Sequence, residues 1–238
     1  LYDPVKAVRT EAARRLAEEP ANRVRPDQQK VFESALKEFE ASMEYSADFA
    51  FGRYNLGNLY AGLNRQEEAV RNYKAAIKID DLFYPAKVNL AMLYNRIDEN
   101  EKAKALLHEV VDAYPEMYEI DYSLGLLLVE MKEYDQALVF LQKASDNMPE
   151  RARVHYNFGL LLQFLKRDAE AEAALTKALK LDTDSMDYLY ALADFYLKRG
   201  HFQKAKNIAE MLVAKHPEHR IGHELLEVAR RNLQKEIP

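Results

Sequence analysis

Three histidines near the C-terminal end of the sequence are of a type and spacing that could bind a transition metal. They are His216, His219 and His223, and Glu224 follows the last of them. Imidazole nitrogens and carboxylate oxygens at helical spacing can coordinate zinc or a similar ion. Pro217, however, breaks any helix between His216 and the other two. The sequence therefore favours no metal ligands here, and metal binding by the three histidines stays the alternative.

Other catalytic chemistry has little support in the composition. The 238 residues include no Cys, which excludes thiolate nucleophiles, zinc fingers, iron–sulfur ligation and covalent haem attachment from this segment. None of the seven glycines lies in a Gly-rich loop followed by Lys-Ser/Thr, so no phosphate-binding loop is present. The acidic pairs fall at expected inter-helix turns, where no desolvated pocket is indicated. We expect neither an enzyme nor a bound cofactor.

Charge and hydropathy exclude two classes of partner. Basic residues number 34 and acidic residues 39, which gives a net charge of −5 with no Lys/Arg run. A nucleic-acid surface is therefore not expected. The longest apolar stretch lies around 124–129, far below the ~20 residues of a membrane span, so we expect no membrane insertion. The low glycine content favours an all-helical protein with short loops.

A period of 34 residues runs through most of the sequence. Gly57, Gly125 and Gly159 each follow a large apolar residue in a similar context, at separations of 68 and 34. Stepping by 34 places Ala91 and Ala193 at the equivalent positions. Small residues also recur twelve positions further on, at Ala69, Ala103, Ala137, Ala171 and Ala205. Three of the repeats end in proline, at Pro115, Pro149 and Pro217.

This pattern resembles the tetratricopeptide repeat (TPR), whose 34-residue unit is a pair of antiparallel helices. Five full repeats fit, at 50–83, 84–117, 118–151, 152–185 and 186–219, and the best copy is 54–60 followed by Ala69, Tyr73 and Ala76. The resemblance implies an all-α fold: a right-handed α-solenoid (superhelix) of antiparallel helix pairs.

The spacing of small residues predicts close helix crossings. A small residue at the eighth repeat position should let the first helix approach the second at the small residue twelve positions on. Enlarging Ala137 or Ala171 should then overpack the crossing by roughly 1–3 kcal/mol. The fourth position, usually bulky and apolar in this family, is mostly polar here: Arg53, Lys87, Asp121, His155 and Leu189. The tyrosines at the fifth position either replace that packing or face the groove.

The inner groove is the strongest candidate binding site. In TPR solenoids the second, fifth, sixth and ninth positions of the first helix face the concave surface. An asparagine amide carries donors and an acceptor, so a row of asparagines can pair with an extended peptide backbone, and tyrosines are good anchors. The predicted groove residues are Tyr54, Asn55, Asn58, Asn89, Met92, Tyr122, Ser123, Leu126, Tyr156, Asn157, Leu160 and Tyr190. The alternative is that these asparagines and tyrosines are common TPR consensus residues without a ligand.

One subtype of groove is not supported by the sequence. Some TPR domains hold the C-terminal carboxylate of chaperones with two asparagines and several basic residues. Asn58 and Asn89 match the asparagines, but Tyr54, Glu119 and Ser123 stand where the basic residues should be. An anionic peptide end would meet no cation, so this clamp is rejected.

The two ends of the sequence differ from the repeats. The pattern of residues 27–46 predicts one amphipathic helix. This helix belongs to a degenerate TPR unit that covers residues 27–49. Residues 18–26 contain Pro20 and Pro26 and are predicted to form a connector. Residues 1–26 thus comprise this connector and a preceding segment with Asp3-Pro4-Val5 and Val8-Arg9, which resembles the second half of a HEAT repeat. We infer a HEAT array upstream of Leu1. Residues 220–238 should form a capping helix with a polar outer face.

Half a HEAT unit, a proline-containing joint and five TPR repeats together resemble the C-terminal part of bacterial multihaem cytochrome c proteins. The resemblance implies an exported, periplasmic setting, although the haem motifs are absent from this sequence, and a cytoplasmic location is not excluded. Two hypotheses follow. The first is a scaffold that binds an extended peptide or a partner domain in the concave groove. The alternative is a spacer or docking arm of a larger redox protein that contacts its own upstream domains.

Overall fold

The chain is helical in the parts that the structure describes. This computed structural model describes residues 1–18 and 24–235, which contain helices and no strand. The residues group into two compact units, here called the N-terminal half (Leu1–Ile120) and the C-terminal half (Asp121–Pro238). No helix in the described ranges combines the length and the apolar character needed to cross a bilayer. The all-α expectation is confirmed.

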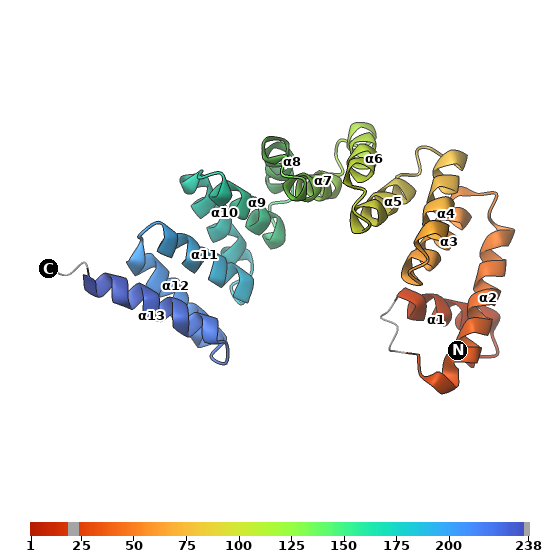
Figure 1. The fold of residues 1–238 in the computed structure, drawn as a ribbon, viewed down its shortest axis with the longest axis horizontal. Coiled ribbons are helices and arrows are strands. Elements are labelled where there is room, and N and C mark those ends of the chain that lie inside the picture. Colours follow the sequence, from red (N-terminus) through yellow and green to blue (C-terminus); the bar gives the residue numbers. More distant parts are fainter. Residues whose placement is uncertain (19–23, 236–238) are drawn as a thin grey trace. The chain divides into compact units, whose positions relative to one another are not determined.

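Each of the five 34-residue frames contains two helices, and the first helix begins at the first residue of its frame (Figure 1). Neighbouring helices of the sequence pack on one another in both halves, for example α3 on α4 and α9 on α10. The helix bounds therefore follow the period that the small residues indicate. The pairs are α3 (Ala50–Gly62) and α4 (Gln66–Ile79), α5 (Tyr84–Arg96) and α6 (Asn100–Ala113), α7 (Tyr118–Glu130) and α8 (Tyr134–Asn147), α9 (Ala152–Phe164) and α10 (Asp168–Leu181), and α11 (Met186–Lys198) and α12 (Phe202–Lys215).

Further helices flank the pairs at both ends. They are α1 (Lys6–Glu18), the short 3-10 helix η2 (Pro26–Gln28), α2 (Gln29–Tyr45) and α13 (Arg220–Lys235). The buried side of α2 is formed by Phe32, Ala35, Leu36 and Phe39, at the helical spacing expected of an amphipathic helix. Of the predicted connector, Pro20 lies outside the described residues, whereas Pro26 begins η2.

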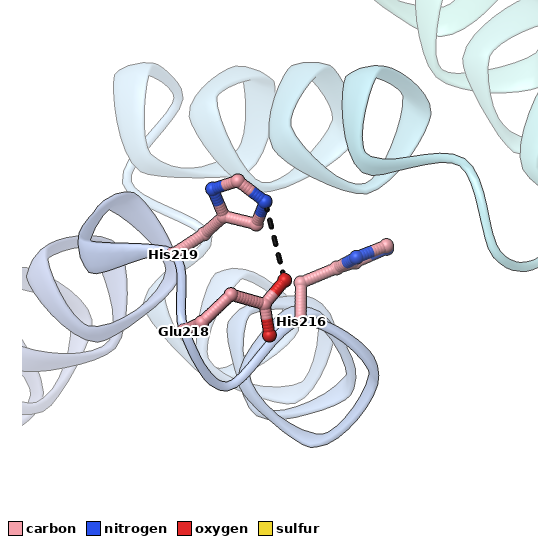
Figure 2. A group of neighbouring side chains, drawn as sticks. All are labelled: His216, Glu218 and His219. Atoms are coloured by element: carbon pink, nitrogen blue, oxygen red, sulfur yellow. Dashed lines mark ion pairs between the residues drawn. The ribbon is translucent and has the colours of Figure 1, made fainter.

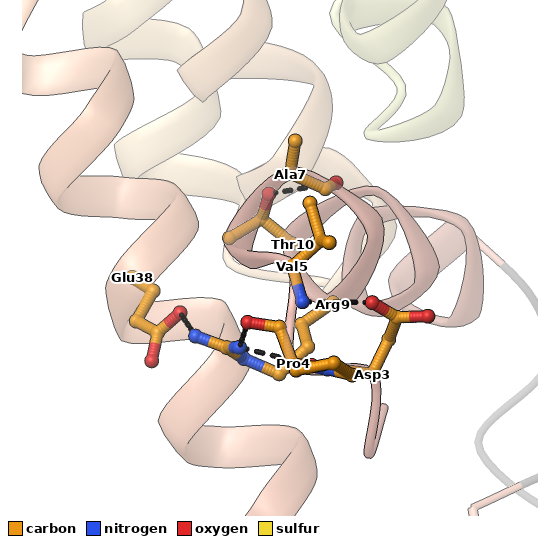
Figure 3. Close-up of polar contacts among 7 residues, drawn as sticks. All are labelled: Asp3, Pro4, Val5, Ala7, Arg9, Thr10 and Glu38. Carbon is orange, nitrogen blue, oxygen red and sulfur yellow. Dashed lines mark hydrogen bonds and ion pairs between the residues drawn. The ribbon is translucent and has the colours of Figure 1, made fainter.

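Helix α1 packs on α2 and α3. Ala13 and Ala17 are buried in a cluster with Phe32 and Leu36 of α2. Arg9 fastens the start of α1: its guanidinium donates to the Asp3 and Pro4 carbonyl oxygens at 2.9 and 2.8 Å and pairs with Glu38 of α2 at 2.8 Å (Figure 3). Tyr2 and Val5, which precede α1, and Val8 in its first turn remain exposed.

A residue in the left-handed backbone region connects the two helices of every repeat. The positions recur at intervals of 34: Asn64, Asp98, Lys132, Lys166 and Gly200, with φ between 57° and 73°. Asn, Asp and Gly adopt this conformation readily, whereas lysine does so at a cost of roughly 1 kcal/mol. The repeat geometry therefore imposes the left-handed conformation at this position. Three of the five repeats have a residue there that adopts it readily: Asn64, Asp98 and Gly200.

The repeat glycines make room for a large side chain of the second helix. A Cβ added at Gly57 would lie 2.5 Å from ring carbons of Tyr73, and one added at Gly125 would lie 2.7 Å from Cγ of Leu141. Each partner is sixteen residues further along the chain. The alanines twelve positions on, such as Ala137, are fully buried but are not the nearest neighbours. The glycines therefore leave room for the large residue sixteen positions on.

Two of the polar fourth positions, Asp121 and Lys87, form ion pairs between the two helices of their repeat. Asp121 is only 1% exposed and accepts a hydrogen bond from Lys143 Nζ at 3.0 Å. Burial raises the pKa of the Asp121 carboxyl, and Lys143 opposes that rise. One repeat earlier the charges are reversed, since Lys87 Nζ lies 2.7 Å from Glu109 Oε2 in a more exposed pair.

Candidate functional site

The predicted groove residues lie on the first helices of the repeats and fall into two groups. Spacings of one and four residues place them on one side of each helix. The group of the N-terminal half comprises Tyr54, Asn55 and Asn58 on α3 with Asn89 and Met92 on α5. The group of the C-terminal half comprises Tyr122, Ser123 and Leu126 on α7, Tyr156, Asn157 and Leu160 on α9, and Tyr190 on α11.

In the N-terminal half, Asn58 and Asn89, here called the asparagine pair, are joined by a hydrogen bond. Asn89 Nδ2 donates to Asn58 Oδ1 at 2.7 Å and to the Tyr54 hydroxyl at 3.2 Å. The Tyr73 hydroxyl of α4 also donates to Asn58 Oδ1, at 2.8 Å. Three helices therefore fix the orientation of both amides.

This bonding leaves the amide nitrogen of Asn58 and the amide oxygen of Asn89 available. Asn58 Oδ1 accepts two hydrogen bonds, while Asn58 Nδ2 donates none within the described residues. Both hydrogens of Asn89 Nδ2 are used, while Asn89 Oδ1 accepts none there. Both residues are half-buried. An N–H donor beside a carbonyl acceptor is complementary to the carbonyl and N–H of a peptide backbone.

The asparagine pair lines a pocket of about 400 Å³ that also contains a cation. Its wall is formed by Asn58, Ala61, Gly62, Tyr73, Asn89 and Arg96. Arg96 ends α5, seven residues after Asn89 and on the same side of the helix, and it is exposed. Arg96 is not one of the basic positions of the chaperone clamp, so comparison with that clamp predicts no cation here. The signal was present, since Asn89 and Arg96 are two helical turns apart.

In the C-terminal half, leucine replaces asparagine at the ninth position of α7 and α9. Asn157 Nδ2 donates to the Tyr122 hydroxyl at 2.5 Å, the counterpart of the bond from Asn89 to Tyr54. Leu126 stands in the place of Asn58. Burial raises the pKa of the Tyr122 hydroxyl, and the bond from Asn157 opposes this. Here the asparagine is joined to a tyrosine but has no second asparagine.

The tyrosines at the fifth position contribute to packing. Tyr54 is half-buried and contacts the ring of Phe83 edge-on at 5.4 Å. Tyr156 lies 5.0 Å from the ring of Tyr188, and burial raises its pKa. Tyr190, by contrast, is 40% exposed. Tyr54 and Tyr156 thus pack against neighbouring rings, with part of each surface still accessible.

In the structure, two of the three C-terminal histidines lie close together, and a glutamate takes the place of the third. His216, Glu218 and His219 gather at the turn between α12 and α13 (Figure 2), with one possible ligand atom of each within 4.8 Å of the others. His223 on α13 is not part of this group, and its Nε2 lies 3.1 Å from the Pro217 carbonyl oxygen. Another histidine, His155, is buried and bonded to the Ser145 hydroxyl at 2.8 Å, which is a packing role.

An all-helical fold of stacked antiparallel pairs, with its candidate site on the first helices, defines a helical-repeat protein. A tetratricopeptide repeat model matches residues 98–161 and 166–227, more than half of the chain, and a second one matches residues 52–81. The chain belongs to the tetratricopeptide repeat family, which confirms the sequence interpretation. No curated protein matches the chain.

Many solved structures are similar to the chain. YrrB, described as a TPR protein with an unusual peptide-binding site, is 21% identical with a TM-score of 0.66, over 79% of this chain and 96% of its own. MamA from Desulfovibrio magneticus RS-1 is 20% identical with a TM-score of 0.62, over 76% and 96%. PilF from Pseudomonas aeruginosa is 21% identical with a TM-score of 0.62, over 83% and 94%. At these identities the likeness shows the fold alone.

Proposed function

We propose that the chain is a protein-interaction scaffold that binds an extended peptide or a partner domain along the first helices of its repeats. The observation that carries the proposal is the asparagine pair, whose available donor and acceptor line a pocket in the N-terminal half. The inner surfaces of helical solenoids are their usual binding faces. TPR repeats bind protein partners, and the family consists generally of non-enzymatic scaffolds.

The asparagine pair would contact peptide backbone, so this part of the site would accept different sequences. A peptide carbonyl would accept from Asn58 Nδ2, and the N–H of the same strand would donate to Asn89 Oδ1. Side-chain preference would come from exposed apolar residues beside it, such as Met92, which is 58% exposed. The peptide-binding site reported for YrrB supports this type of ligand.

The proposal is tested with a random peptide library displayed on phage and selected on the chain. A synthetic copy of an enriched peptide is then titrated calorimetrically against the chain and against the double variant Asn89→Ala/Asn157→Ala. We expect weaker binding to the double variant, because each alanine removes an amide of the first helices. Circular dichroism should show unchanged helical content.

The matched control is Asn207→Ala, an exposed asparagine on α12, a second helix. This variant should bind the peptide as tightly as the unmodified chain. If no peptide is enriched, or if the double variant binds as well as the control, the groove is not the binding surface.

One observation favours the alternative of a docking arm that contacts upstream domains of the same polypeptide. Tyr2, Val5 and Val8 form an exposed apolar side at the start of the chain, with exposures of 66%, 55% and 49%. The resemblance to multihaem cytochromes would place a preceding domain there. Sequence upstream of Leu1 that contains repeated Cys-x-x-Cys-His would support this alternative, and its absence from the full polypeptide would remove it.

A further inference from the structure

The turn between α12 and α13 carries three side chains with metal-ligating atoms in one small region. We propose that His216, Glu218 and His219 form a binding site for a divalent transition-metal ion of the zinc type (Figure 2). Their candidate ligand atoms all lie within 4.8 Å of one another. The site is separate from the asparagine pair and does not depend on peptide binding.

Pro217 brings the two histidines together. The backbone N–H of His219 donates to the His216 carbonyl oxygen at 3.1 Å, which closes a four-residue turn with Pro217 at its second position. Proline is favoured at that position because its φ is already fixed near the required value. The rings of His216 and His219 are 6.0 Å apart between centroids. Helical spacing alone predicts that Pro217 separates His216 from His219, whereas the turn brings them together.

The hydrogen bond of His216 selects the nitrogen that is available to a metal. His216 Nε2 lies 2.7 Å from the Asp184 carbonyl oxygen, which can only accept a hydrogen bond. Nε2 therefore carries the proton, and in the neutral ring Nδ1 holds the lone pair. A backbone carbonyl that binds the second ring nitrogen is the usual support of a metal-ligating histidine, because it fixes the tautomer and the ring orientation.

The local charges favour a cation. Glu218 brings a negative charge, and its Oε1 already lies 3.2 Å from His219 Nε2. Two cations are neighbours in sequence, and each is neutralised by a carboxylate: Lys215 pairs with Asp184, and Arg220 pairs with Glu224 at 2.6 Å.

The side chains can contract around an ion. Tetrahedral zinc sites place ligand atoms roughly 3.4 Å apart, so the three atoms must move closer by small rotations of the side chains. His219 and Glu218 are 48% and 66% exposed, so packing does not oppose such rotations. Two imidazoles and one carboxylate suit zinc, nickel, cobalt or copper, whereas magnesium and calcium require oxygen ligands.

The experiment is a calorimetric titration of the full chain, without a polyhistidine tag, with Zn²⁺ and separately with Mg²⁺. We expect one Zn²⁺ per chain and no binding of Mg²⁺. The variants His216→Gln, Glu218→Gln and His219→Gln should each weaken Zn²⁺ binding by about tenfold or more, as loss of one ligand predicts. All three positions lie at the surface, and circular dichroism will verify the fold of each variant.

His223→Gln is the matched control, because His223 lies one helical turn away on α13 and outside the group. This variant should bind Zn²⁺ as the unmodified chain does. The proposal is overturned if the chain binds no Zn²⁺, if His219→Gln binds it normally, or if His223→Gln loses binding to the same extent as His219→Gln.

Discussion

The two halves of the chain use the same repeat positions to build different surfaces. In the N-terminal half the ninth position of α3 is Asn58, and the side chain that meets it from α4 is Tyr73. In the first two repeats of the C-terminal half the same two positions are occupied by leucine pairs: Leu126 and Leu141 in one repeat, and Leu160 and Leu175 in the next. The crossing glycine is present in all three repeats.

This difference separates what the fold needs from what a ligand surface needs. The glycine and the large residue of the second helix form the crossing, and either Leu or Tyr fills it. Tyrosine at the crossing also brings a hydroxyl group, which leucine lacks. The repeat that has this tyrosine, Tyr73, is also the one that has asparagine, Asn58, at the ninth position. The N-terminal half therefore adds a second amide at Asn58, whereas the C-terminal half keeps the amide of Asn157 and has leucine at positions 126 and 160.

The largest effect is expected from enlarging the crossing glycines. Gly57→Ala and Gly125→Ala should each destabilise the chain by roughly 2–3 kcal/mol, because overpacking outweighs the gain in helix propensity. Only Gly57→Ala should also weaken peptide binding, since its Cβ displaces Tyr73, which holds Asn58. Denaturant unfolding and the peptide titration measure the two effects. If both variants bind the peptide with equal affinity, the packing of Tyr73 on Gly57 does not support the asparagine pair.

The charged fourth positions should respond unequally in the two halves. Lys143→Met leaves the buried Asp121 carboxylate without its cation and should cost about 2 kcal/mol, less than for a fully buried pair because Lys143 is partly exposed. The equivalent change in the exposed pair, Glu109→Gln, should cost about 0.5 kcal/mol or less. Urea unfolding at neutral pH tests both.

The cost of Lys143→Met should also depend on pH. Burial raises the pKa of Asp121, so the folded chain binds the proton more readily than the unfolded chain does. The penalty is therefore present at neutral pH and shrinks as the pH falls through that raised pKa. A penalty that grows towards acid pH would contradict the assignment.

A smaller effect is expected at the hydroxyl that orients the asparagine pair. Tyr73→Phe keeps the ring against Gly57 but removes the donor to Asn58, and should cost about 1 kcal/mol of unfolding free energy. The peptide affinity should fall in the same variant, because Asn58 loses one of the bonds that fix its amide. Unchanged stability together with unchanged affinity would show that the hydroxyl has no such role.

The repeat register and the helix pairs could be predicted from the sequence because small residues recur at fixed intervals. The identity of the glycine's neighbour could not, since spacing alone does not say whether a small or a large residue occupies the crossing. The Asp121–Lys143 pair was also missed. The sequence contains a hint of this pair, because Lys87 and Glu109 stand 34 residues before Asp121 and Lys143 with the charges reversed. The hint is found only when both helices of the two repeats are aligned by position.

The candidate site was predicted in part. Its positions follow from the TPR register, but the bond between Asn58 and Asn89 depends on side-chain orientations fixed by Tyr54 and Tyr73. The grouping of His216 with Glu218 and His219 could not be predicted from helical spacing. Helical spacing was applied across Pro217, where the backbone forms a turn instead. The HEAT-like segment and the cytochrome setting stay predictions.

The most direct test replaces Asn58 of the N-terminal half with leucine, the residue found at the equivalent position 126 of the C-terminal half. The affinity of the selected peptide is measured for the unmodified chain, for Asn58→Leu and for the control Asn207→Ala. Asn58→Leu should bind about tenfold more weakly, because it removes the amide donor and the partner that orients Asn89, and Asn207→Ala should bind normally. Binding of Asn58→Leu at the unmodified affinity would contradict the central claim.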